Sequence, residues 1–190
     1  MLMLICAAAV VLPMHVVTRP PLEPAAEEKV MAEVTELEKL IEQHKQESDV
    51  VIERMRRLKD DDVDDYERKT IKRRLSHEFH SVLLQLGVPE GVAFRVASMC
   101  ARHTVSGIHP EGTRRGESIV RYFRCDSVRA LYELDEMITS GFMCAAFTEI
   151  IHSLTSSTPT VYVYVKPDDF DFVLSSLNSL QDTGLFWGLK

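Results

Sequence analysis

Residues 160–165 read Thr-Val-Tyr-Val-Tyr-Val, an uninterrupted alternation of two kinds of side chain. Successive side chains of a β-strand point to opposite faces of the sheet. The alternation therefore predicts a strand with a valine face and a tyrosine face. The Lys166-Pro-Asp-Asp169 run that follows predicts the end of the strand and the beginning of a last helix.

A second strand is predicted over residues 118–125, which are rich in β-branched and aromatic residues and contain no Gly or Pro. Helical apolar spacing follows it in two segments broken by Ser140-Gly141. The fold class is therefore α+β, with a small ferredoxin-like sandwich after an N-terminal helical arm. Because two strands do not make a stable sheet, further strands are expected from other segments, such as Phe186–Trp187, or from a partner chain.

The stretches GESIVRYFRCDSVRALYELDEMITSGFMCAAFTEIIHSL and TVYVYVKPDDFDFVLSSLNSL, within residues 117–180, resemble the TRADD N-terminal-domain-like family. The shared pattern is a strand that ends in Arg-Cys, a helix, a Ser-Gly break, a second helix, an alternating strand and an acidic-aromatic helix start. The resemblance implies an α/β sandwich that acts by protein–protein contact in apoptotic or innate-immune signalling. In that family an exposed strand face binds the partner.

The organisation predicted from composition has four parts. Residues 1–24 hold an apolar run and a Pro-rich spacer, 25–106 are helical, 107–116 form a Gly/Pro linker, and 117–190 form the α/β module. Two interpretations of residues 1–17 stay open: a membrane segment or signal, and a truncated start or buried element of a longer gene product. The run is shorter than the roughly 20 apolar residues that span a bilayer, and no Lys or Arg precedes Arg19.

From residue 25 onward, apolar side chains recur at alternating spacings of four and three, which is the pattern of a coiled-coil seam. The seam residues are Val30, Val34, Leu37, Ile41, Val51, Met55 and Leu58, with His44 and Ser48 in the gap. Two interpretations are equally open: a homo-oligomer through this seam, or a helical hairpin within one chain. The Asp-rich residues 60–65 interrupt the seam and predict a solvated hinge.

Composition restricts the classes of function. The net charge of −7 disfavours a polyanion partner such as nucleic acid. Cys6, Cys100, Cys125 and Cys144 are dispersed without metal-ligand or redox spacing, which suits a reducing, cytoplasmic location. No phosphate loop or catalytic constellation is recognisable, so we expect no enzyme, no metal and no cofactor.

The candidate partner-binding residues are Tyr122, Tyr162 and Tyr164, since exposed aromatic side chains anchor many interfaces. The alternative is that these tyrosines lie under a helix as part of the core. The leading hypothesis is a non-enzymatic interaction or adaptor module. Two others are a membrane-tethered coiled-coil scaffold and an RNA-binding ferredoxin-like module, in which sheet aromatics would stack on bases.

Overall fold

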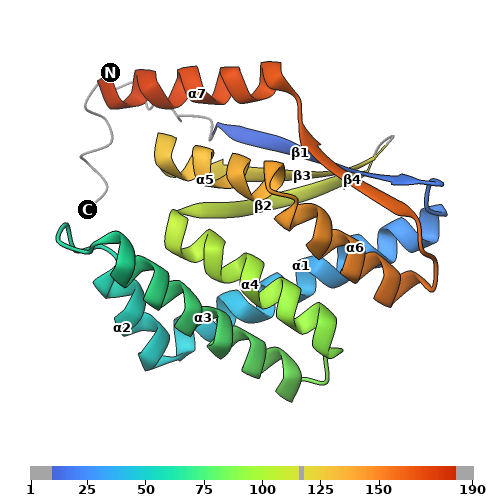
Figure 1. The fold of residues 1–190 in the computed structure, drawn as a ribbon, viewed down its shortest axis with the longest axis horizontal. Helices are drawn as coiled ribbons and strands as arrows, with labels where there is room; N and C mark the ends of the chain where they lie inside the picture. The colour runs from blue at the N-terminus through green and yellow to red at the C-terminus, as the bar shows by residue number, and fades with distance from the viewer. Residues whose placement is uncertain (1–9, 116–117, 183–190) are drawn as a thin grey trace, which may run out of the picture.

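The computed structural model describes residues 10–115 and 118–182. Within them, four strands and seven helices follow one another along the chain (Figure 1). In order they are β1 (Val11–Arg19), α1 (Pro24–Glu47), α2 (Asp49–Arg57), α3 (Asp65–Gln85), α4 (Glu90–Ser106), β2 (Ile108–Arg115), β3 (Ile119–Cys125), α5 (Val128–Thr139), α6 (Phe142–Thr155), β4 (Thr160–Val165) and α7 (Pro167–Asp182). The α+β class is confirmed, as are the strands predicted near residues 118–125 and 160–165.

The strands form one sheet in the order β2-β3-β1-β4, and every neighbouring pair is antiparallel. Strand β1 therefore lies in the interior of the sheet between β3 and β4. Residues 11–17, which sequence analysis placed in an apolar segment outside the module, belong to its sheet. A short apolar run has the same composition whether it enters a membrane or a protein core, so composition alone did not separate the two cases. Residues 1–9 lie outside the described part of the chain.

The predicted linker at 107–116 is also wrong over most of its length, because Ile108–Arg115 forms the edge strand β2. Its register shifts between Pro110 and Gly112, where the edge position tolerates a proline without an amide hydrogen. Gly107 ends α4 in the left-handed conformation, at φ 72°. Two of the four strands thus come from outside the predicted module at 117–190, and Phe186–Trp187 lies beyond the described residues.

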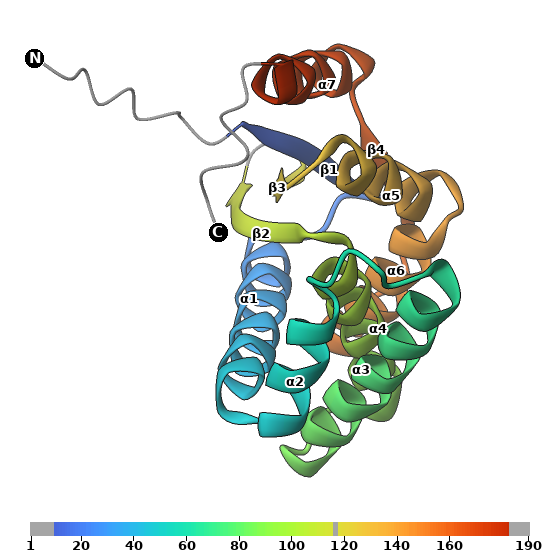
Figure 2. The same ribbon diagram turned by 90° about the vertical axis from the view of Figure 1, so that its left-hand side faces the viewer.

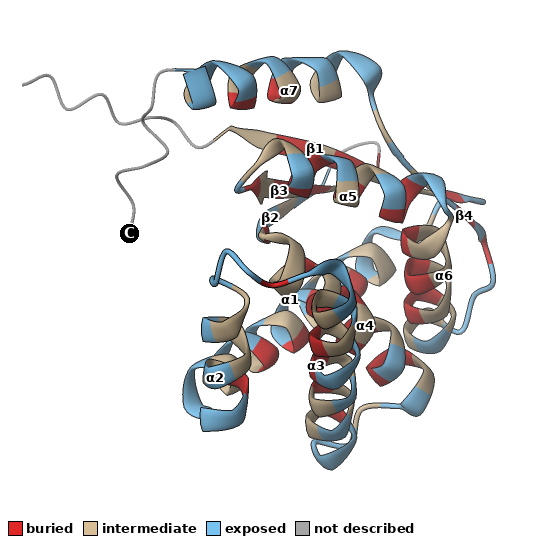
Figure 3. Cartoon of the chain, turned by 60° about the vertical axis from the view of Figure 1, so that its left-hand side comes forward, coloured by how far each residue is buried: buried red, intermediate tan, exposed pale blue. Residues whose placement is uncertain are grey.

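The helices cover one face of the sheet. Leu12, Met14 and Val16 of β1 are buried on this face together with Phe123 of β3 and with the inner sides of α4, α5 and α6. Figure 3 shows the buried positions in the strands and along these helices. In Figure 1, α7 lies toward the β1–β4 end of the strand order, where it contacts β1 and α5, and α1 to α4 lie toward the β2 end. One hydrophobic core therefore joins the helical arm to the sheet.

The predicted seam packs within the chain. Its residues on α1 and α2, Val30, Val34, Leu37, Ile41 and Val51, are at most 2 % exposed, and Met55 and Leu58 pack against the same core. The intramolecular alternative thus describes the structure. The side chains that a homo-oligomer through this seam would use are covered within one chain, so the packing favours the intramolecular alternative. The seam also stops at Ser48, which separates α1 from α2 and accepts a hydrogen bond from the Val51 amide as the N-cap of α2.

Among the described helices, none by itself has the length and apolar character to cross a bilayer. Helices α5 and α6 together meet those two criteria, but they meet at a 59° bend. Most of their apolar side chains belong to the core shared with the sheet.

Candidate functional site

The face of the sheet opposite α5 carries no described helix (Figure 2). Strand register decides which side chains share this face. His15 of β1 lies opposite Tyr164 of β4, and Val17 lies opposite Tyr162. On the other side of β1, Pro13 lies opposite Tyr122 of β3. The three tyrosines predicted from sequence therefore share one surface, which we call the open face.

Burial separates the two faces of the sheet. Val161 is 5 % exposed, whereas Tyr162 and Tyr164 are 47 % and 42 % exposed. The alternation along residues 160–165 thus has the predicted meaning, with valines toward the core and tyrosines outward. Tyr122 is half-buried, because it lies on an interior strand with neighbours on both sides.

Two of the aromatic side chains on the open face contact neighbouring side chains through their rings. The rings of His15 and Tyr164 stack with their centroids 5.0 Å apart and an interplanar angle of 10°. The His15 Nδ1 atom lies 3.3 Å from the hydroxyl oxygen of Ser118, within hydrogen-bonding distance. Partial burial, followed by the charge of Lys166, lowers the pKa of His15 and favours the neutral ring. The guanidinium of Arg19 lies over the ring of Tyr162, 5.7 Å from its centroid.

His15 and Arg19 were not among the predicted site residues, because the sequence pattern did not indicate a strand over residues 11–19. The available signal was the alternation of Leu12, Met14 and Val16 with intervening residues. That signal was weak because the intervening positions are mostly apolar as well.

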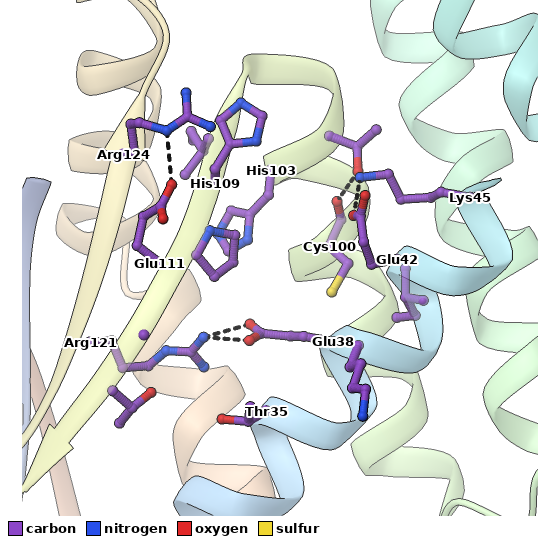
Figure 4. A pocket seen from close by; sticks show the side chains of 17 residues that line it. Thr35, Glu38, Glu42, Lys45, Cys100, His103, His109, Glu111, Arg121 and Arg124 are labelled. Carbon is purple, nitrogen blue, oxygen red and sulfur yellow. Dashed lines mark hydrogen bonds and ion pairs between the residues drawn. The ribbon is translucent and has the colours of Figure 1, made fainter. Parts of the chain in front are cut away.

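A second candidate site is a cavity of about 440 Å³ lined by residues of α1, α4, β2 and β3 (Figure 4). On its wall, Arg121 of β3 reaches Glu38 of α1, and the guanidinium Nη2 donates to both carboxylate oxygens at 2.7 and 2.6 Å. Arg121 is 2 % exposed and its guanidinium lies 5.5 Å from the Phe123 ring centroid. This ion pair connects the sheet to the helical arm inside the core.

His103 of α4 lines the same cavity and is 3 % exposed. Neither of its ring nitrogens has a hydrogen-bond partner among the described residues, and its ring meets Phe123 edge-on at 5.3 Å. Burial first, then the charges of Arg121 and Lys45, lowers the pKa of His103 to about 3. The ring is therefore neutral at physiological pH.

The chemistry of this cavity favours a structural role. Burial raises the pKa of the Cys100 thiol, so its nucleophilic thiolate form is suppressed. Its cations are largely matched by carboxylates, since Arg121 pairs with Glu38, Lys45 with Glu42 and Arg124 with Glu111. Within residues 10–115 and 118–182, no group of three His, Cys, Asp or Glu side chains is arranged to hold a metal ion. The open face is therefore the stronger candidate site.

No family model matches this chain, and neither the curated proteins nor the solved structures that were compared with it include a match.

Proposed function

We propose that the protein is a non-enzymatic interaction module that binds a partner protein through the open face. The observation that carries this proposal is the joint placement of Tyr122, Tyr162 and Tyr164 on one sheet surface without a described helix over it. Tyrosine combines a large apolar ring with a polar hydroxyl, which suits a surface that is wet when free and dry when bound.

The topology supports a ferredoxin-like assignment for this module. Strand, helices, two strands, helices and strand follow one another, and the sheet order is β2-β3-β1-β4 with antiparallel neighbours. This order is compatible with the split β-α-β arrangement, with additional helices in each crossover, and so supports the proposal. Such a sheet has one helix-covered face and one face free to bind, which agrees with the placement of the tyrosines.

The place of this module in apoptotic or innate-immune signalling is part of the proposal and rests on the resemblance of residues 117–180 to the TRADD N-terminal-domain-like family. The membrane-tethered coiled-coil scaffold is less well supported, because residues 11–17 lie within β1 and the seam residues lie in the core. We therefore propose an adaptor, with a cytoplasmic location as part of the hypothesis to test.

The test compares the full chain with a Tyr162→Ser/Tyr164→Ser variant as bait in cross-linked cell extracts. Tyr66→Ser is the matched control, since Tyr66 is 80 % exposed at the start of α3, away from the sheet. We expect the double variant to lose the proteins that the wild type captures, and the control to keep them. Equal capture by all three chains would refute binding through the open face, provided that circular dichroism shows each chain folded.

A further inference from the structure

Three exposed cations without an ion-pair partner among the described residues lie at the rim of the open face, although the chain as a whole is acidic. Arg19 lies at the end of β1, Arg114 lies on β2 opposite Val120, and Lys166 directly follows β4. All three are exposed, and none forms an ion pair with another described residue. The total charge of the chain is −7, so these three cations differ in sign from the chain as a whole.

The acidic groups near this face are mostly engaged elsewhere. Arg124 binds Glu111 at 2.8 Å and Asp126 at 2.7 Å, and His109 Nε2 lies 2.7 Å from the other carboxylate oxygen of Asp126. Asp169, in the first turn of α7, is the acidic residue that acts electrostatically on His15, where it opposes the stronger effect of Lys166. Lys166 lies beside Asp168 and Asp169 of α7, whereas Arg19 and Arg114, which have no ion-pair partner among the described residues, are positive charges at the β1 and β2 ends of the open face.

The centre of the face is apolar and aromatic. One row crosses all four strands and consists of Arg114, Val120, His15 and Tyr164. With strands spaced about 4.8 Å apart, this row covers roughly 14 Å from β2 to β4. That width corresponds to between two and three turns of an α-helix.

We infer that the partner of the open face is an acidic amphipathic helix, whose apolar side packs on Val17, Val120 and the tyrosines while its carboxylates meet Arg19, Arg114 and Lys166. This inference rests on the proposed function and adds the chemistry of the partner to it. A sheet face presents side chains and no free backbone groups, so a segment that binds there must satisfy its own backbone hydrogen bonds, as a helix does. Opposite charges at the rim then select the partner and orient it.

Nucleic acid fits this surface less well. Bases bind sheet aromatics by stacking on free ring faces. Here one side of the Tyr164 ring is occupied by His15, and Arg19 lies over the ring of Tyr162. The overall negative charge opposes a polyanion as well.

The experiment uses the full chain and a fluorescent synthetic helical peptide of about 15 residues, roughly 22 Å long. Its apolar side carries leucines and its polar side carries glutamates, and a second peptide has lysine at each glutamate position. Fluorescence anisotropy is expected to show binding of the glutamate peptide only. That binding should weaken as salt is raised, because the Debye length falls to about 3 Å at 1 M.

Two charge-reversal variants locate the binding. The first variant carries Arg19→Glu, Arg114→Glu and Lys166→Glu. Its affinity for the glutamate peptide is expected to be lower by about tenfold or more. The control Lys69→Glu/Arg73→Glu/Arg74→Glu makes the same change in net charge on exposed positions of α3 and should change affinity less than about twofold. Equal weakening by both variants, equal binding of the two peptides, or no binding of either peptide would overturn the inference.

Further outcomes distinguish a failure of this inference from a failure of the proposed function. If Tyr162→Ser/Tyr164→Ser abolishes binding but the rim variant has no effect, the acidic partner is wrong and the open face remains a binding site. If neither variant changes binding, both proposals fail. If single-stranded oligouridylate bound more tightly than the glutamate peptide, the result would indicate that the partner is nucleic acid and not a protein. Self-association that the rim variant abolishes would identify a second copy as the occupant instead.

Discussion

The two faces of the sheet are formed by the same four strands, but they differ in burial and in the kinds of side chain that they carry. On the covered face, Leu12, Met14 and Phe123 are completely buried and even Arg121 is enclosed. On the open face, aromatic and positively charged side chains remain accessible at the ends of the rows. Because neighbouring residues of one strand belong to opposite faces, single substitutions one position apart can test this division directly.

The largest expected difference is between Phe123 and Tyr122, adjacent residues of β3. Phe123→Ala removes a completely buried ring that contacts the core, and should lower the free energy of unfolding by about 3–5 kcal/mol. Tyr122→Ala removes a half-buried ring from the open face and should cost about 1 kcal/mol. Urea denaturation followed by circular dichroism measures both values. Equal losses would mean that the open face is covered in solution.

The second comparison concerns two ion pairs of β3, one on each face. Glu38→Ala leaves the buried Arg121 guanidinium without its carboxylate and should cost about 3 kcal/mol. Glu111→Ala breaks the exposed pair with Arg124 and should cost less than about 1 kcal/mol.

A double replacement checks the reason for the first of these effects. Arg121→Met with Glu38→Met removes both charges together and should recover most of the stability lost in Glu38→Ala, since no unpaired charge is then buried. If the double variant is as unstable as Glu38→Ala, the loss comes from packing around the cavity and not from the isolated charge.

The pH dependence of the free energy of unfolding should also differ between the two faces, through His103 on the covered side and His15 on the open face. His103, in contact with Phe123, has a pKa of about 3 in the folded chain, below the ordinary value of 6.5, so the unfolded chain binds more protons between these two values. Its contribution to stability is complete above pH 6.5 and is lost as pH falls toward 3. The slope is at most about 1.4 kcal/mol per pH unit.

His103→Leu should flatten the dependence of unfolding free energy on pH between 6.5 and 4. His15→Phe, which keeps an aromatic ring beside Tyr164, should flatten it less, because His15 is only partly buried and its pKa is less strongly lowered. Thermal and urea unfolding of both variants across this range measure the difference. A wild-type slope retained in His103→Leu would show that other groups dominate the acid sensitivity.

Local pattern was sufficient for part of this architecture. The alternation at 160–165 correctly predicted a strand with a valine face and a tyrosine face, because the two faces of this strand carry different kinds of side chain. Whether the tyrosines are exposed was not decided by the alternation. The sequence of strand β1 does not distinguish its two faces, because Pro13 and Val17 on the open face are as apolar as the residues on the covered face. Strand β2 contains Pro110 and Gly112, which are typical of loops, and its edge position and bulge are decided by pairing with β3.

Long-range contacts explain the rest of what sequence analysis missed. Arg121 and Glu38 are 83 positions apart, and no spacing rule connects them. The apolar seam is compatible with an oligomer and with packing inside one chain, and the choice between them depends on the helices α4 and α6 that α1 packs against. His15 joined the candidate site only through its pairing with β4.

The smallest expected effect on stability belongs to the tyrosines of β4. Tyr162→Ser/Tyr164→Ser should lower the free energy of unfolding by about 1 kcal/mol or less, since both rings are more than 40 % exposed and the serines keep a hydroxyl at the surface. Val161→Asp, one position from Tyr162, places a charge at a site only 5 % exposed and should destabilise the fold by several kcal/mol. Melting curves for the two variants, run beside the binding measurement, therefore separate recognition from folding. A large stability loss in the tyrosine variant would show that the rings are part of the core, and the open face would no longer account for binding.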